Sequence, residues 1–102
     1  MILIEVVLAT GEAERAAFVG LLRDTVAGSL AEEGCLAYRA TGSLDDPLVF
    51  HLLEIWESEQ AYLAHRQGET FARFLERLPQ TGRVIAIERR AGTMEAYHPV
   101  QS

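Results

Sequence analysis

The chain has 102 residues, enough for one domain with one core but too few for that core to enclose a deep cavity as well. Its net charge of −6 opposes binding to nucleic acid or anionic membranes, and the absence of lysine excludes Schiff-base chemistry and a Walker-type phosphate loop. Hydrophobic residues make up 49% of the chain, which excludes a disordered protein. A pocket for a small molecule is therefore expected to be shallow or shared with a second subunit.

The start of the chain predicts a strand. Residues 2–9 are apolar and rich in β-branched side chains, and they lack the cationic start of a signal peptide. No apolar run approaches the roughly 20 residues that span a bilayer, so we expect a cytoplasmic protein. The single cysteine, Cys35, cannot form an internal disulfide, and its apolar surroundings favour a small core residue over a nucleophile.

A helix and a second strand follow the first strand. Thr10 is predicted to cap a helix from Glu12 to Glu32, because apolar residues recur there on one helical stripe. Gly34 is expected to be the C-cap glycine of this helix. Alternation over residues 35–42 then predicts a strand.

The strongest strand pattern covers residues 48–57. Both sides of this strand are largely apolar, which is typical of a strand that is covered on both faces. One side carries Phe50, Leu52, Glu54 and Trp56, and the other carries Val49, His51, Leu53 and Ile55.

The last third of the chain predicts a broken helix and a fourth strand. Ser58 is expected to cap a short helix that reaches about His65. A second helix, at about Glu69–Leu78, has an apolar stripe that includes Phe71, and Pro79 is expected to stop it. Residues 83–90 predict the fourth strand.

This order is β-α-β-β-α-β, with the second helix broken. It predicts a ferredoxin-like α+β fold with a four-stranded antiparallel sheet that has helices on one face only. The chain is expected to be one domain over residues 1–102, with a core at about 1–92 and a C-terminal arm at 93–102. We expect the side of strand 48–57 that bears Phe50, Leu52 and Trp56 to lack helices, and a homodimer to cover it.

Glu54 and Trp56 are the first candidates for a functional site. A carboxylate between Leu52 and Trp56 must be paired, be hydrogen bonded or have a raised pKa. It is either a buried partner of an arginine or a pocket acid or base. Trp56 is either a core aromatic or a pocket wall whose indole N–H donates to a substrate oxygen, and Tyr38 and Tyr62 offer the same combination of ring and polar tip.

His65 is the candidate proton carrier. It lies just before the helix break at Gly68, where it could overhang the mouth of a pocket, although a histidine near a helix end also suits the helix dipole. His51 points away from Glu54 and is expected to be structural. No metal site is expected, because His51, His65 and Cys35 do not have a standard ligand spacing.

Three segments carry a further pattern: EGCLAY at 33–38, FHLLEIW at 50–56 and AYLAH at 61–65. The three segments are a glycine-to-tyrosine segment, a strand that ends in Glu-x-Trp and a helix that ends in histidine. With them, the chain resembles the antibiotic biosynthesis monooxygenase (ABM) family over about residues 1–92. The resemblance implies a dimeric α+β barrel. It also implies that the side of the strand with Phe50, Leu52, Glu54 and Trp56 looks into the barrel.

For the enzymatic members, the resemblance implies cofactor-free monooxygenation of a small aromatic substrate, such as a quinol, an anthrone or a phenolic polyketide. The protein helps to deprotonate the substrate, whose anion passes an electron to dioxygen, so only a shaped apolar pocket, hydrogen-bond donors and a base are needed. His65 would be the base. The substrate-binding residues would be Tyr38, Phe50, Leu52, Glu54, Trp56, Tyr62 and Phe71.

Two other functions fit the same resemblance. One is a non-catalytic dimer that binds a small molecule, and the other is an isomerase of a small signalling hydroxy-ketone. The superfamily also includes haem-degrading monooxygenases, which use an Asn, Trp and His triad. Haem is not expected as a partner here, because the chain has no asparagine and the Trp and His positions of that triad match His65 and Leu75.

Overall fold

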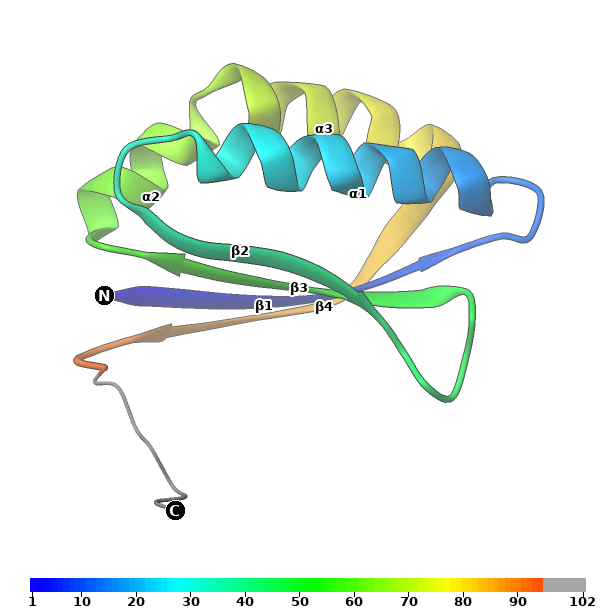
Figure 1. The fold of residues 1–102 in the computed structure, drawn as a ribbon, viewed down its shortest axis with the longest axis horizontal. Coiled ribbons are helices and arrows are strands. Elements are labelled where there is room, and N and C mark those ends of the chain that lie inside the picture. The colour runs from blue at the N-terminus through cyan, green and yellow to red at the C-terminus, as the bar shows by residue number, and fades with distance from the viewer. Residues whose placement is uncertain (95–102) are drawn as a thin grey trace, which may run out of the picture.

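The sheet and the helices form two separate layers in the computed structural model, which describes residues 1–94. All three helices lie on one side of the sheet (Figure 1). The predicted ferredoxin-like α+β order, with the second helix broken into two, is confirmed. The elements are β1 (Ile2–Thr10), α1 (Arg15–Leu30), β2 (Cys35–Gly42), β3 (Val49–Trp56), α2 (Glu59–Arg66), α3 (Glu69–Thr81) and β4 (Gly82–Ala91).

The sheet is antiparallel, with strand order β2-β3-β1-β4. β1 is central, which explains why its sequence is apolar on both sides. Its pairing with β3 runs from Ile2 opposite Trp56 to Ala9 opposite Val49. β4 is an edge strand, and most of its residues are exposed.

The side of β3 that carries Phe50, Leu52, Glu54 and Trp56 faces the helices. These four side chains are buried in the core of a single chain. The expectation that this side lacks helices and needs a second subunit is therefore wrong, and so is the implied view into a barrel between subunits. Because both sides of β3 are apolar, alternation separates its two sides but does not tell which one the helices cover.

Two of the predicted helix signals act differently in the structure. The hydroxyl of Thr10 donates to the carbonyl of Thr81 at 2.6 Å, so it joins the ends of β1 and α3 instead of capping α1. Pro79 lies inside the last turn of α3 and does not stop it. A proline so near the end removes only one helical hydrogen bond, and the hydroxyl of Thr81 donates to the carbonyls of Arg77 and Leu78. The predicted cap at Ser58 is confirmed, because its hydroxyl accepts from the amide of Ala61 at 3.1 Å.

The prediction that Gly34 is the C-cap glycine of the first helix is wrong, because α1 ends at Leu30 with Ala31 as its C-cap, and Gly34 lies in the loop that leads to β2. Its φ of +81° is in the left-handed region that favours glycine. A β-carbon at this position would lie 2.5 Å from the Cβ of Ala61 in α2. The carbonyl of Gly34 accepts from the amide of Glu57 at 2.8 Å, so the glycine lets this loop pack closely against the end of β3 and the start of α2.

None of the helices within residues 1–94 is long and apolar enough to cross a membrane. The predicted C-terminal arm at 93–102 falls outside the described residues from position 95 onward.

Candidate functional site

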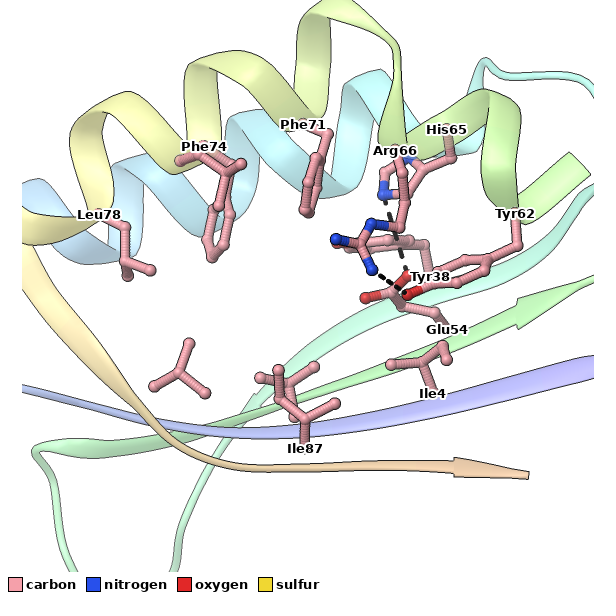
Figure 2. Close-up of a pocket in the computed structure, with 13 residues that line it drawn as sticks. Ile4, Tyr38, Glu54, Tyr62, His65, Arg66, Phe71, Phe74, Leu78 and Ile87 are labelled. Atoms are coloured by element: carbon pink, nitrogen blue, oxygen red, sulfur yellow. Dashed lines mark hydrogen bonds and ion pairs between the residues drawn. The ribbon is translucent and has the colours of Figure 1, made fainter.

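A cavity of about 210 Å³ lies between the sheet and the helices α2 and α3 (Figure 2). Its walls come from one chain, and its small volume agrees with the shallow pocket expected from the chain length. Three of its apolar lining residues, Leu75, Val84 and Ile87, are also exposed to solvent, so the cavity opens between α3 and β4. The lining residues are Ile4, Val6, Tyr38, Glu54, Tyr62, His65, Arg66, Phe71, Phe74, Leu75, Leu78, Val84 and Ile87.

The polar lining residues gather at one end of the cavity, and apolar side chains form the rest of its wall. Figure 2 shows Tyr38, Glu54, Tyr62, His65 and Arg66 at this polar end, with Phe74 and Leu78 farther along α3. An apolar cavity with a few convergent polar groups is the usual form of a small-molecule site.

His65 is buried in the last turn of α2, and both of its ring nitrogens face a carboxyl group. Its Nδ1 lies 2.6 Å from Oε1 of Glu32, a residue of the loop between α1 and β2. Since a carboxylate oxygen only accepts, Nδ1 carries the hydrogen of this bond. The bond fixes the ring so that Nε2 faces Glu54, at 3.9 Å from its Oε1.

Glu54 extends from β3 into the polar end of the cavity and is only 6% exposed. Its Oε1 accepts from the indole N–H of Trp56 at 3.0 Å. Burial raises the pKa of the Glu54 carboxyl above its ordinary value, although the hydrogen bond from Trp56 and the nearby His65 oppose this effect. A carboxyl group with a raised pKa beside an imidazole is suited to exchange a proton with it.

Tyr38 lies opposite Glu54 in the pairing of β2 with β3. Burial, and then the charge of Glu54, raise the pKa of the Tyr38 phenol above its ordinary value. Tyr38 therefore stays neutral and keeps a hydroxyl that can donate a hydrogen bond. Its ring centre is 5.9 Å from that of His65, so the phenol and the imidazole border the same end of the cavity.

The sequence model of the antibiotic biosynthesis monooxygenase family matches residues 1–77, which include β1 to β3, α2 and most of α3. The chain belongs to this family. None of the curated proteins matches it.

Solved structures share the ABM fold over nearly the whole chain. The Pseudomonas aeruginosa protein PA3566 is 26% identical, with a TM-score of 0.82 over 91% of this chain and 94% of that one. A Bacteroides thetaiotaomicron protein of unknown function, described as a possible oxidoreductase, is also 26% identical, with a TM-score of 0.82 over 87% of this chain and 94% of that one. A Deinococcus radiodurans protein described as a candidate antibiotic biosynthesis monooxygenase is 20% identical, with a TM-score of 0.84 over 99% of this chain and 100% of that one; this likeness shows the fold alone.

Five of the residues that the sequence suggested for an ABM site line the cavity. They are Tyr38, Glu54, Tyr62, His65 and Phe71. Phe50, Leu52 and Trp56 do not line it. Phe50 packs against Phe18 in the core, with ring centres 5.6 Å apart, and Leu52 is buried in the same cluster.

Trp56 contacts two residues of the site, His65 and Glu54. Its ring lies 4.5 Å from that of His65, and its N–H is used by Glu54, so it holds these two side chains and does not present its indole to the cavity. The alternative in which Glu54 pairs with a buried arginine has no counterpart among the described ion pairs.

Sequence reasoning missed two residues of the site, Glu32 and Arg66. Glu32 was named only as the last residue of the first predicted helix, and its partner His65 is 33 positions away. Arg66 follows His65 directly and resembles an ordinary basic residue at a helix end. Neither position has a local pattern that distinguishes it from a solvated charge.

Two other chemistries find no support in the described part of the chain. No three His, Cys, Asp or Glu side chains within residues 1–94 are grouped to hold a metal ion. His51, which was expected to be structural, lies exposed on the helix-free side of the sheet, on the opposite side of β3 from the cavity. The thiol of Cys35 is partly buried, and burial raises its pKa, which disfavours the thiolate that a nucleophile requires.

Proposed function

We propose that this ABM protein is a cofactor-independent monooxygenase of a small phenol, quinol or anthrone bound in the cavity between the sheet and α2–α3. The observation that carries the proposal is the chain of contacts from Glu32 through His65 to Glu54. It places a buried, oriented imidazole and a carboxyl group with a raised pKa at the polar end of an apolar cavity. Deprotonation of an electron-rich hydroxyl group needs such an arrangement.

His65 is proposed to act as the base. Its Nδ1–H is held by Glu32, which leaves Nε2 to take a proton at the cavity side. Glu32 then pairs with the imidazolium at Nδ1 and stabilises its charge. The hydroxyl groups of Tyr38 and Tyr62 are proposed to donate hydrogen bonds to the substrate oxygen as it becomes anionic.

The reaction balances without another reductant. The substrate anion gives one electron to dioxygen, and the resulting carbon radical and superoxide combine to a peroxide. Loss of water from the peroxide then leaves a carbonyl group. For an anthrone, the methylene group loses two hydrogens, one oxygen atom becomes the new carbonyl oxygen, and the other leaves as water. The substrate itself supplies all four electrons.

Oxygen uptake tests this function directly. We expect the purified protein to consume dioxygen above the rate in buffer when a panel of quinols, anthrones and phenols is supplied with a chelator and no flavin. Incorporation of one labelled oxygen atom from ¹⁸O₂ into the product would identify a monooxygenase. If no member of a broad panel gives uptake above buffer, the monooxygenase assignment fails. Thermal stabilisation by the same compounds without product would then indicate a binding protein, and a rearranged hydroxy-ketone would indicate an isomerase.

We further propose that two copies associate through the helix-free side of the sheet. That side carries apolar residues from central strands, among them Leu3, Val7 and Leu53, which are only half-buried in one chain. Its charges are divided. Glu5 and Glu88 lie opposite each other on β1 and β4, with Arg90 bound to both, while Arg39 and His51 lie on β2 and β3. A two-fold axis can place the apolar centre of one copy against that of the other, while Arg90 neutralises part of the charge of Glu5 and Glu88.

Sedimentation at micromolar concentration tests this association. We expect a species of about twice the 11.3 kDa chain mass. Leu53→Arg places a charge in the middle of the proposed interface and is expected to give the monomer. Leu63→Arg, on the exposed side of α2, is the matched control and should leave the dimer intact. A wild-type monomer would contradict the proposed interface and would leave the cavity, which one chain forms alone, unaffected.

A further inference from the structure

Arg66 brings a positive charge to the polar end of the cavity. It is the last residue of α2, and its guanidinium extends inward beside Tyr62 (Figure 2). Its Nη1 donates to the hydroxyl oxygen of Tyr62 at 3.4 Å, and its Cζ lies 5.2 Å from the centre of the Phe71 ring. Contacts with two aromatic side chains from α2 and α3 therefore hold the guanidinium at the cavity. Within the described residues, it is the only arginine among those that line this cavity.

Within residues 1–94, no carboxylate forms an ion pair with Arg66. Arg89 differs from Arg66 in this respect. Its Cζ lies 5.6 Å from the centre of the same Tyr62 ring, but its guanidinium forms an ion pair with Glu59. Glu54 is the carboxyl group of the cavity, and it already accepts from Trp56. Burial raises the pKa of the Glu54 carboxyl, and the charge of Arg66 is the smallest of the effects that oppose this rise. Arg66 is exposed in the free protein, so water solvates its guanidinium until an anionic ligand in the cavity pairs with it.

The remainder of the cavity defines the other part of that ligand. Beyond Arg66 the wall is formed by Phe71 and Phe74, whose rings are inclined by 27° with centres 6.5 Å apart, and then by aliphatic side chains. Flat apolar molecules pack well against such rings. A volume of about 210 Å³ limits the ligand to a small ring system.

We infer that the cavity selects an aromatic carboxylate that also carries the reacting hydroxyl group, with its carboxylate on Arg66 and its ring against Phe71 and Phe74. The role of the hydroxyl group, directed toward His65 and Glu54, rests on the proposed function. The carboxylate contact does not rest on it, because it depends only on the geometry of Arg66.

A matched set of ligands tests the inference. The probes are 2,5-dihydroxybenzoate, its neutral methyl ester and 1,4-dihydroxybenzene, and binding is measured by calorimetry without oxygen so that no turnover occurs. We expect the acid to bind on the order of ten-fold more tightly than the ester, as a hydrogen bond between charged groups provides. Arg66→Met should bring the ratio of the two affinities to about one. Arg73→Met, which changes an exposed arginine of α3 outside the cavity, is the matched control and should preserve the ratio.

The outcomes separate this inference from the proposed function. Equal binding of acid and ester, failure of the acid to bind, or an unchanged ratio in Arg66→Met would overturn the carboxylate class, even if neutral quinols support oxygen uptake. Selective, Arg66-dependent binding of the acid without oxygen uptake would support the carboxylate site and count against the monooxygenase.

Discussion

Replacing His65 with alanine is expected to lower kcat by between about 100-fold and 10,000-fold, the usual contribution of a positioned general base. The imidazole is the group that connects Glu32 to Glu54 at the polar end of the cavity, so no other side chain there repeats its position. Binding of the substrate should change much less than kcat, because the aromatic wall of the cavity remains. The measurement is steady-state oxygen uptake with the best substrate from the panel.

His51→Ala is the matched control for this prediction. His51 is exposed on the helix-free side of the sheet, on the opposite side of β3 from Glu54, and its replacement should leave kcat unchanged. His65→Gln retains a polar side chain and should lose activity as His65→Ala does, which separates loss of the base from loss of packing. An effect on KM alone, or equal effects of His51→Ala and His65→Ala, would refute the role of His65 as the base.

Trp56→Ala is expected to lower the free energy of unfolding by about 3–5 kcal/mol, the typical cost of removing a fully buried large aromatic side chain. Trp56 is 0% exposed, and its ring packs under His65. Chemical denaturation at fixed protein concentration measures the change. Leu63→Ala, on the exposed side of α2, should stay within about 0.5 kcal/mol of the wild type. A loss of less than about 1 kcal/mol in Trp56→Ala would contradict the packing described for β3 and α2.

Trp56→Phe separates the hydrogen bond from the packing. Without the indole N–H, Glu54 loses a bond that favours its charged form, so its pKa should rise further above the ordinary value. A carboxyl group with a raised folded-state pKa loses its contribution to stability as the pH rises through that pKa. The stability lost in Trp56→Phe should therefore be about 1–3 kcal/mol larger near pH 8 than near pH 4, in addition to the pH-independent cost of replacing the larger indole. A difference that does not depend on pH would show that the bond to Glu54 contributes little.

The element order could be predicted from local patterns, because each strand and helix has its own hydrophobic periodicity. The strand at 48–57 and the helix that begins after Ser58 match the structure closely. The orientation of the sheet could not be predicted in the same way. Both sides of β3 are apolar, and the difference between them arises only when α1, α2 and α3 cover one side.

The site was predictable in part, for a similar reason. His65 and Glu54 could be predicted from the sequence, because Glu54 is a titratable residue in an apolar strand and His65 is a titratable residue at the end of a helix. Glu32 and Arg66 did not, because their importance depends on partners that folding brings together from distant positions. The indole of Trp56 illustrates the same limit, since its residue type suggested a donor to a ligand while the tertiary structure directs that donor to Glu54.

Trp56 is also the only tryptophan of the chain, and it is in contact with both the imidazole and the carboxyl group of the cavity. Its fluorescence therefore arises from one place in the molecule. A neighbouring imidazolium quenches indole emission more than neutral imidazole does, so the emission should respond to proton movement between His65 and Glu54. The protein thus contains its own optical reporter of the site, which can follow ligand entry and proton transfer in stopped-flow experiments without an added dye.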